Sequence, residues 1–332
     1  MADIILYRYK NSAYSRRVEF HLLLRDIKYK QCTQPSIMPR PDVAALGLQY
    51  RRIPIMSVGN DVILDSSRHV ARLQQFADGP NAVMQPTTPD QSAIQFLVSQ
   101  YVCKAFFRTA ALILPLDGAF LKNPAFIEDR RKLLGVDFAA AAKARAPAAK
   151  AELIALFEWL ENGLLADGRT WILSTEKLTA VDVEAVWFIV WLDEIPGALA
   201  EEYFGPARFP RVRAWITRFR AALAEAKARS REPDSLTGDE AARLIKAAAP
   251  SAIKAGFRLD DPVVASLGLQ LGEEVTIWTS DVPNAKEKDT GALLDLTSDE
   301  IVLDVTTETG SFRLWAPRNN FHIQKAALKE KI

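Results

Sequence analysis

The sequence predicts an α/β segment, then an all-helical segment, then a small β-rich segment. Short apolar runs alternate with helical patterns over residues 1–79, and helical spacing dominates residues 88–229. Alternating apolar and polar residues return in residues 234–332, after an opening helix. Polar stretches at residues 78–90 and 230–235 separate the three parts. We therefore expect three domains with the boundaries 1–79, 88–229 and 234–332.

The first segment shows the order β-α-β followed by β-β-α. Its strands are apolar or aromatic runs, and each helix follows a polar break. The expected elements are strands at residues 4–9, 29–32, 53–58 and 62–64, with helices from about Ser15 and directly after Asp65. Gly59-Asn60 is a typical two-residue hairpin turn between the last two strands. This order matches a thioredoxin-like layout.

Two capping boxes mark helix starts in the later segments. Thr179-Ala-Val-Asp182 precedes an apolar helix expected from Val183 to Leu192. Thr237-Gly-Asp-Glu240 opens a helix at the start of the third segment. We expect residues 260–325 to form a small antiparallel barrel or sandwich.

Composition excludes several classes of protein. The chain has 332 residues, is 49% hydrophobic and has a formal net charge of +1, without a charge block that predicts nucleic acid or an anionic membrane as a partner. Its longest apolar run, Val186 to Leu192, is too short to span a bilayer. Two cysteines and three scattered histidines argue against a disulfide framework or a metal cluster. We expect a cytoplasmic protein.

Four motifs follow one another along residues 4–225. They are Leu6-Tyr-Arg-Tyr-Lys-Asn-Ser12, Tyr50-Arg-Arg-Ile-Pro54-Ile, Leu64-Asp65-Ser66 and Leu178-Thr179-Ala-Val-Asp182. In this order they resemble the glutathione transferase superfamily: its first strand and helix start, its cis-proline strand, its acid-plus-serine motif and its buried helix. The resemblance implies an α/β thioredoxin-like domain followed by an all-α glutathione-transferase domain. The β-rich third segment resembles an extension found on some fungal glutathione-transferase-like proteins.

The resemblance implies that Ser12 activates the thiol of bound glutathione. A hydrogen bond from Ser12 Oγ and the positive end of the following helix would stabilise the thiolate and lower the pKa of the thiol. The alternative is that Ser12 is simply an N-cap. Tyr7 or Tyr14 could supply the hydroxyl instead, or could pack in the core or the pocket wall.

The resemblance also implies how glutathione itself would be held. A cis bond before Pro54 would turn the backbone of Ile53 toward the cysteinyl part of glutathione. The amide of Ser66 would hold the γ-glutamyl carboxylate, Asp65 would pair with the ammonium group, and Arg52 would lie near the glycyl carboxylate. The alternatives are a trans proline in an edge strand, a helix cap without a ligand and a solvated arginine.

A second substrate would lie between the first two domains, where ligand sites commonly form. The candidates for this pocket are aromatic or basic residues on two helices, namely Tyr101, Phe106, Phe107, Arg108, Trp187 and Trp191. The alternative for all of them is packing in the helical core. The polar linker at residues 230–235 suggests that the third segment contributes no residue to the glutathione site.

The resemblance implies a glutathione-dependent transferase, lyase or isomerase that acts on an electrophilic small molecule. Such a substrate would fit a fungal secondary-metabolite intermediate or a compound to be detoxified. The alternative is a non-catalytic regulatory or interaction protein. Retention of Ser12, Ile53-Pro54 and Asp65-Ser66 favours the enzyme, and the lack of a Cys-x-x-Cys motif disfavours a thioredoxin-type oxidoreductase. Family members are commonly dimers, which implies a homodimer, although a third domain could cover the usual dimer face.

Overall fold

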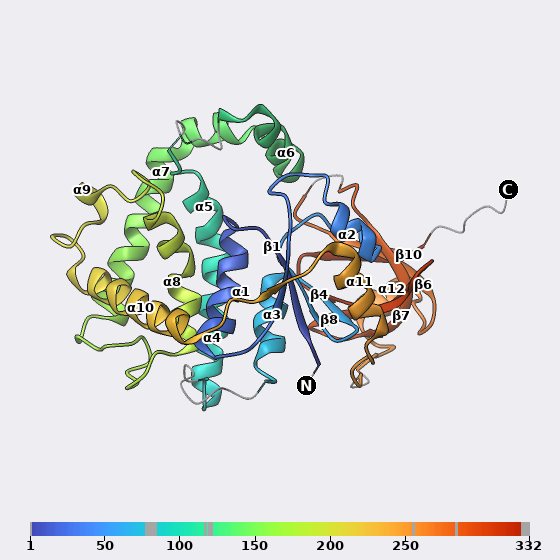
Figure 1. Ribbon diagram of the computed structural model, residues 1–332. Helices are drawn as coiled ribbons and strands as arrows, with labels where there is room; N and C mark the ends of the chain where they lie inside the picture. The colour runs from blue at the N-terminus through green and yellow to red at the C-terminus, as the bar shows by residue number, and fades with distance from the viewer. Residues whose placement is uncertain are drawn as a thin grey trace. The chain divides into compact units, whose positions relative to one another are not determined.

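A computed structural model describes residues 2–76, 85–115, 118, 122–253, 256–282 and 285–326 (Figure 1). The chain forms two compact units, each assembled from separate parts of the sequence. The first unit contains Met1–Ser15, Tyr29–Arg72 and Pro233–Ile332, and the second contains Arg16–Lys28 and Leu73–Glu232. The three consecutive domains expected from the sequence therefore differ from the division that the structure shows.

The first unit is built on one sheet, which has ten strands in the described part of the chain. The strand order is β10-β6-β7-β8-β9-β4-β3-β1-β2-β5. The strands are β1 (Ile4–Arg8), β2 (Lys30–Thr33), β3 (Ile55–Val58), β4 (Asp61–Leu64), β5 (Asp234–Ser235), β6 (Glu274–Thr279), β7 (Asp289–Leu296), β8 (Glu300–Thr307), β9 (Gly310–Pro317) and β10 (Phe321–Lys325).

The four N-terminal strands form the expected thioredoxin-like group. Strand β1 is parallel to β2 and antiparallel to β3, and β3 forms the predicted hairpin with β4. The helix between β1 and β2 is α1 (Ala13–Leu24), and α3 (Ser66–Leu73) follows β4. The fold class predicted for this segment is confirmed, with element ends that shift by a few residues.

Strands from the third segment continue the same sheet on both sides of this group. Strand β9 pairs parallel with β4, with Val62 opposite Leu314, and β5 pairs parallel with β2. The β-rich character predicted for the segment is confirmed, but its strands extend an open sheet and do not form the expected separate barrel or sandwich. The alternating pattern predicts that a strand has one buried face, but it does not specify which strand edge it joins.

One apolar core serves both parts of this sheet. Three helices contribute to it: α2 (Pro41–Leu46), α11 (Gly238–Ala247) and α12 (Pro262–Leu267). Its buried members include Ile55 and Leu64 from the N-terminal strands and Leu303 and Leu314 from the C-terminal strands. Asn60 in the β3–β4 turn also donates hydrogen bonds to the carbonyls of Ile245 and Ser311, both at 3.0 Å. A shared core means that residues 234–332 are packed as part of the first unit.

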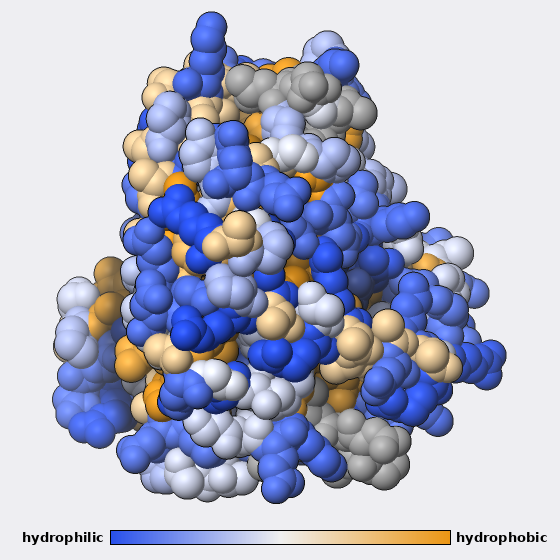
Figure 2. Space-filling model, turned by 90° about the vertical axis from the view of Figure 1, so that its left-hand side faces the viewer, coloured by the Kyte–Doolittle hydropathy of each residue, from blue (hydrophilic) through white to orange (hydrophobic). Residues whose placement is uncertain are grey.

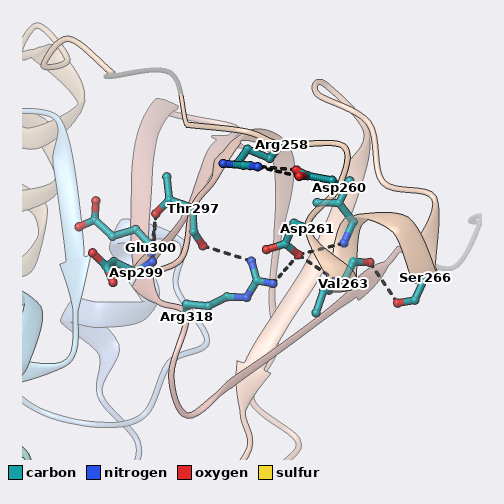
Figure 3. A network of polar contacts seen from close by, with 10 residues as sticks. Arg258, Asp260, Asp261, Val263, Ser266, Thr297, Asp299, Glu300 and Arg318 are labelled. Atoms are coloured by element: carbon teal, nitrogen blue, oxygen red, sulfur yellow. Dashed lines mark hydrogen bonds and ion pairs between the residues drawn. The ribbon is translucent and has the colours of Figure 1, made fainter.

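A polar network fixes α12 to the ends of the neighbouring strands (Figure 3). The side chain of Asp261 caps α12 by accepting the amides of Val263 and Val264. Arg318, just after β9, donates to Asp261 Oδ1 at 2.7 Å and to the carbonyl of Thr297 at 3.3 Å. Because an arginine fork can join two acceptors, Arg318 links the α12 cap with the β7–β8 turn.

The second unit is helical in its described part. It contains most of α1 together with α4 (Pro89–Tyr101), η1 (Val102–Phe106), α5 (Phe107–Ala111), α6 (Pro124–Leu134), α7 (Phe138–Trp159), η3 (Leu160–Leu164), α8 (Ala180–Asp193), α9 (Glu201–Phe204) and α10 (Pro210–Arg229). The segments η1 and η3 are π-helical turns. The face seen in Figure 2 is mostly hydrophilic, with small separate apolar areas.

Helix α8 is the buried centre of this unit and begins at the predicted capping box. Asp182 accepts the amide and the hydroxyl of Thr179 at 3.0 and 2.7 Å, and also the indole N–H of Trp215. Buried polar groups need such partners, so the capping box stabilises the start of the helix. In the described ranges, no helix is both long and apolar enough to cross a bilayer.

Candidate functional site

Strand register brings three of the predicted motifs to one end of the N-terminal strand group. Ile55, the first residue of β3, lies opposite both Tyr7 near the end of β1 and Leu64 at the end of β4. The residues that follow β1, precede β3 and follow β4 therefore leave the sheet at the same end. This places Ser12, Ile53-Pro54 and Asp65-Ser66 around one end of the first unit.

Ser12 lies directly before α1 and caps it. Its Oγ accepts the amide of Ser15 at 3.1 Å, and its own amide donates to the carbonyl of Tyr9 at 3.0 Å. The residue is 3% exposed. Its hydroxyl proton has no acceptor within the described ranges. Ser12 is thus an N-cap, as the alternative stated, and still has a donor to offer to a ligand.

Tyr7 lies in the core of the first unit, within the hydrophobic cluster beneath the sheet. It is 1% exposed, and its hydroxyl makes no hydrogen bond to the described residues. Burial, together with nearby Cys32 and Asp42, raises the pKa of Tyr7 well above its usual value. Tyr14, the second residue of α1, is partly exposed. The burial of Tyr7 supports the alternative that this residue packs in the core.

The segment before β3 has the geometry that the resemblance implies. The Ile53–Pro54 peptide bond is cis, which confirms that prediction. Ile53 and Pro54 are both buried. They connect β3 to a loop over residues 49–52.

Asp65 caps α3 and has an unusual backbone conformation. Its φ of 69° lies in the left-handed region, which is costly for a non-glycine residue and is often found at functional sites. Its Oδ1 accepts the amide and hydroxyl of Ser67 at 2.9 and 2.6 Å, and Oδ2 has no hydrogen-bond partner among the described residues. Ser66 is the buried first residue of α3. A carboxylate beside a helix N-terminus fits a ligand that carries both an ammonium and a carboxylate group.

The loop before Pro54 is held by acidic residues from the third segment. Arg52 Nη2 lies 2.6 Å from Asp281 Oδ1. Arg51 Nη1 lies 3.4 Å from Glu287 Oε1. These contacts bring residues of the third segment beside a site to which that segment was expected to contribute no residue.

The backbone of the same loop has two further contacts with the third segment. The amide of Gln49 donates to Asp289 Oδ1 at 2.7 Å, and the ring of Tyr50 stacks on Phe321 with 6.1 Å between centroids. Burial raises the pKa of Asp289 to about 6, and the donating amides of Gln49 and Tyr50 offset this only in part. No local motif marks these acids, so the sequence analysis missed them.

The charges around this loop act on one another. Burial opposes the charged form of Arg52, but Tyr50, Asp281 and Asp65 together raise the pKa of its guanidinium. Asp65, the cap of α3, is therefore close enough for its charge to act on Arg52. The loop and the α3 cap form one electrostatic environment within the first unit.

The second-substrate candidates all lie in the second unit, where the five aromatic ones belong to two clusters. Phe107 packs against Trp187 and Trp191, with centroids 5.3 and 5.8 Å apart. Tyr101 packs against Phe106 at 4.7 Å, and also against Trp159 at 6.4 Å, a residue absent from the predicted set.

These candidates differ in how far they are buried. Trp187 is fully buried, which supports core packing for that residue, whereas Tyr101 is 51% exposed and Arg108 is also exposed. Four of them, Tyr101, Phe106, Phe107 and Arg108, lie on or next to the π-helical turn η1, and π-turns are frequent at functional sites. Tyr101 and Arg108 are therefore the most exposed of the candidates, and Phe107 and Trp191 are half-buried.

A buried ionic network that the sequence analysis did not identify joins three helices of the second unit. Glu184 on α8 pairs with Arg17, and His21 Nε2 lies 2.7 Å from Glu184 Oε1. Arg17 also donates to Ser99 on α4 at 2.8 Å. Burial opposes the ionised form of Glu184, but Arg17 and His21 more than offset it and hold the pKa of that carboxyl below its usual range. Because all its members are buried and paired, the network fits a structural role.

The described residues indicate neither a metal-binding group nor a reactive thiol at Cys32. The described residues contain no group of three or more His, Cys, Asp or Glu that could hold a metal ion. Cys32 is buried, and burial, then Asp42, raises its pKa to about 12. A thiol held in this form is a poor nucleophile.

Two family models match the chain. One is described as the glutathione S-transferase N-terminal domain and matches residues 6–81, and the other is described as a domain of unknown function (DUF7962) and matches residues 109–228. A comparison with curated proteins found no match.

Solved structures of GST-like proteins match the fold of this chain. A GST-like protein from Pseudomonas syringae is 18% identical, with a TM-score of 0.69, and the match covers 98% of this chain and 100% of that chain. Beta-etherase LigF from Sphingobium sp. strain SYK-6 is 16% identical, with a TM-score of 0.53, covering 68% of this chain and 99% of that chain. The family model assigns residues 6–81 to the glutathione S-transferase N-terminal domain, and these matches show that the chain has the fold of GST-like proteins. The first of them also extends over the β-rich third segment.

Proposed function

We propose that this protein is a glutathione-dependent enzyme whose first unit binds glutathione and activates its thiol toward an electrophilic small molecule. The observation that carries the proposal is the meeting of Ser12, Ile53-Pro54 and Asp65-Ser66 at one end of the sheet, as strand register requires. Transferase, lyase and isomerase reactions all begin with the same thiolate, so the proposal covers this common step. The cytoplasmic location, the homodimer and the fungal metabolite remain predictions.

Ser12 is the residue proposed to activate the thiol. A thiol with a pKa of about 8.5 is only a few per cent ionised at pH 7. The hydroxyl proton of Ser12 has no acceptor in the described part of the chain, and helix α1 begins at the next residue. A hydrogen bond to the thiolate and the helix N-terminus would both favour the charged form.

Asp65 and Ser66 are proposed to hold the γ-glutamyl end. The start of α3 would bind the carboxylate, and Asp65 Oδ2 would accept a hydrogen bond from the ammonium group. Arg52 would attract the carboxylate at the glycyl end. Tyr101 and Arg108 of the second unit are the exposed candidates for contact with the second substrate.

Calorimetry with glutathione tests this proposal on the full chain. Wild type should give saturable binding, and Asp65→Asn should weaken it about tenfold or more, because the amide removes the charge that pairs with the ammonium group. Asparagine tolerates the left-handed backbone and can still cap α3. Asp26→Asn is the matched control, since Asp26 also has a positive φ but is exposed and lies at the end of α1. Absence of binding by wild type up to about 10 mM would reject the enzyme hypothesis and favour a non-catalytic role.

A further inference from the structure

An ion pair occupies the arginine that is proposed to attract the glycyl end of glutathione. Arg52 and Asp281 contact each other at 2.6 Å, with side chains 28% and 20% exposed. We propose that Asp281 determines the specificity of this site, because it weakens the attraction of Arg52 for a thiol ligand whose glycyl end carries a negative charge. This inference rests on the proposed glutathione site and adds a residue from the third segment to it.

Neighbouring contacts hold both partners of this pair in place. On the Arg52 side, Arg51 is paired with Glu287, and the amide of Gln49 is bound by Asp289. On the other side, Asp281 comes two residues after β6, and the amide of Ser280 donates to the carbonyl of Asn320 at 2.9 Å. These contacts hold the backbone on both sides of the Arg52–Asp281 pair in place.

A ligand carboxylate at Arg52 would therefore share one guanidinium with Asp281. Two carboxylates on the same guanidinium lie within a few ångströms of each other, and like charges at that distance repel. In addition, the negative charge of Asp281 offsets part of the positive charge of Arg52, which weakens the attraction of Arg52 for a second carboxylate. The expected cost to a charged glycyl end is about tenfold in affinity, and an uncharged glycyl end escapes it.

The charges on neighbouring side chains reinforce this preference. The described acids around the loop are Asp65, Asp281, Glu287 and Asp289, and the arginines are Arg51, Arg52 and Arg40, which donates to the carbonyl of Arg51. Asp65 has a proposed partner in the ammonium group at the other end of the ligand, whereas Asp281 faces the glycyl end. The glycyl end is thus the part of the ligand at which Asp281 reduces the benefit of a negative charge.

Calorimetry of the full chain with glutathione and with its glycyl monoethyl ester tests the proposal. Asp281→Asn should raise the affinity for glutathione about tenfold and change the affinity for the ester by less than about twofold. Glu287→Gln is the matched control, because it removes a neighbouring acid that pairs with Arg51, and it should change the ratio of the two affinities by less than about threefold. Melting temperatures show whether each variant is folded.

The outcomes distinguish a failure of the specificity proposal from a failure of the proposed glutathione site. If Asp281→Asn lowers the affinity for glutathione, or changes the affinities for glutathione and the ester by the same factor, Asp281 only orients Arg52. The specificity proposal is then wrong. If wild type and both folded variants bind neither ligand, the proposed glutathione site is rejected and the specificity proposal with it.

Discussion

The two ends of the proposed glutathione site are built in different ways. At the thiol and γ-glutamyl end, Ser12 caps an amide three positions away and Asp65 caps one two positions away. At the glycyl end, Arg52, Arg51 and Gln49 reach acids that are 229, 236 and 240 positions away. One end therefore depends on local helix starts, and the other depends on the strands that residues 234–332 add to the sheet.

Removing the third segment should have the largest effect. A chain that ends at Arg229 lacks buried core residues such as Ile245, Leu303 and Leu314, and exposes the apolar side chains they cover. We expect the first unit to lose its fold, seen as loss of a cooperative melting transition and rapid proteolysis of residues 1–72. Supplying residues 233–332 as a separate fragment should restore the protection of residues 1–72 against proteolysis. A shortened chain that stays folded and keeps its glutathione affinity would show that the segment is an independent module.

A single substitution in the shared core should have a smaller effect in the same direction. Leu314 on β9 is fully buried opposite Val62 on β4, so Leu314→Ala should lower the free energy of unfolding by about 2–5 kcal/mol. The double variant with Val62→Ala should show an interaction energy of about 0.5 kcal/mol or more, because the two residues are neighbours in one core. Denaturant unfolding measures both quantities. Independent losses in two separate transitions would contradict a shared core.

The difference between the two ends explains what the sequence could predict. Ser12, Asp65 and the Thr179–Asp182 box are helix starts, whose residue types and spacing are visible in a few consecutive positions. The third segment was correctly predicted to be β-rich, because alternation is also local. Its pairing with β4 and its acids beside Arg52 depend on contacts across more than 200 positions, for which one sequence contains no signal.

Asp289 should give stability a specific pH dependence. Its folded pKa of about 6 lies above the ordinary value of 3.8, so the unfolded chain releases this proton at lower pH than the folded chain does. The stabilisation is complete below pH 3.8 and is lost as pH rises through 6. Relative to Asp289→Asn, whose amide oxygen can still accept from Gln49, wild type should lose about 3 kcal/mol over this range. Denaturant unfolding of both proteins at pH values from 3.5 to 7 measures this difference, and parallel curves would exclude a neutral buried carboxyl.

Ser12 is expected to have the smallest effect on free energy and the most direct one on function. If its hydroxyl donates to the thiolate, Ser12→Ala should raise the pKa of bound glutathione by about one unit and lower the rate with a saturating electrophile about tenfold. Loss of the α1 cap alone costs about 1 kcal/mol of stability. Thr237→Ala removes a comparable cap from α11 and provides the control for that loss.

The ultraviolet absorbance of the bound thiolate, titrated with pH, tests the central claim most directly. Wild type and Thr237→Ala should titrate together at a pKa below that of free glutathione, and Ser12→Ala should titrate about one unit higher. Superimposable curves for all three proteins, with a lower melting temperature for Ser12→Ala, would contradict the claim. Ser12 would then be only the N-cap of α1, and thiol activation would have to come from the helix N-terminus or from another hydroxyl.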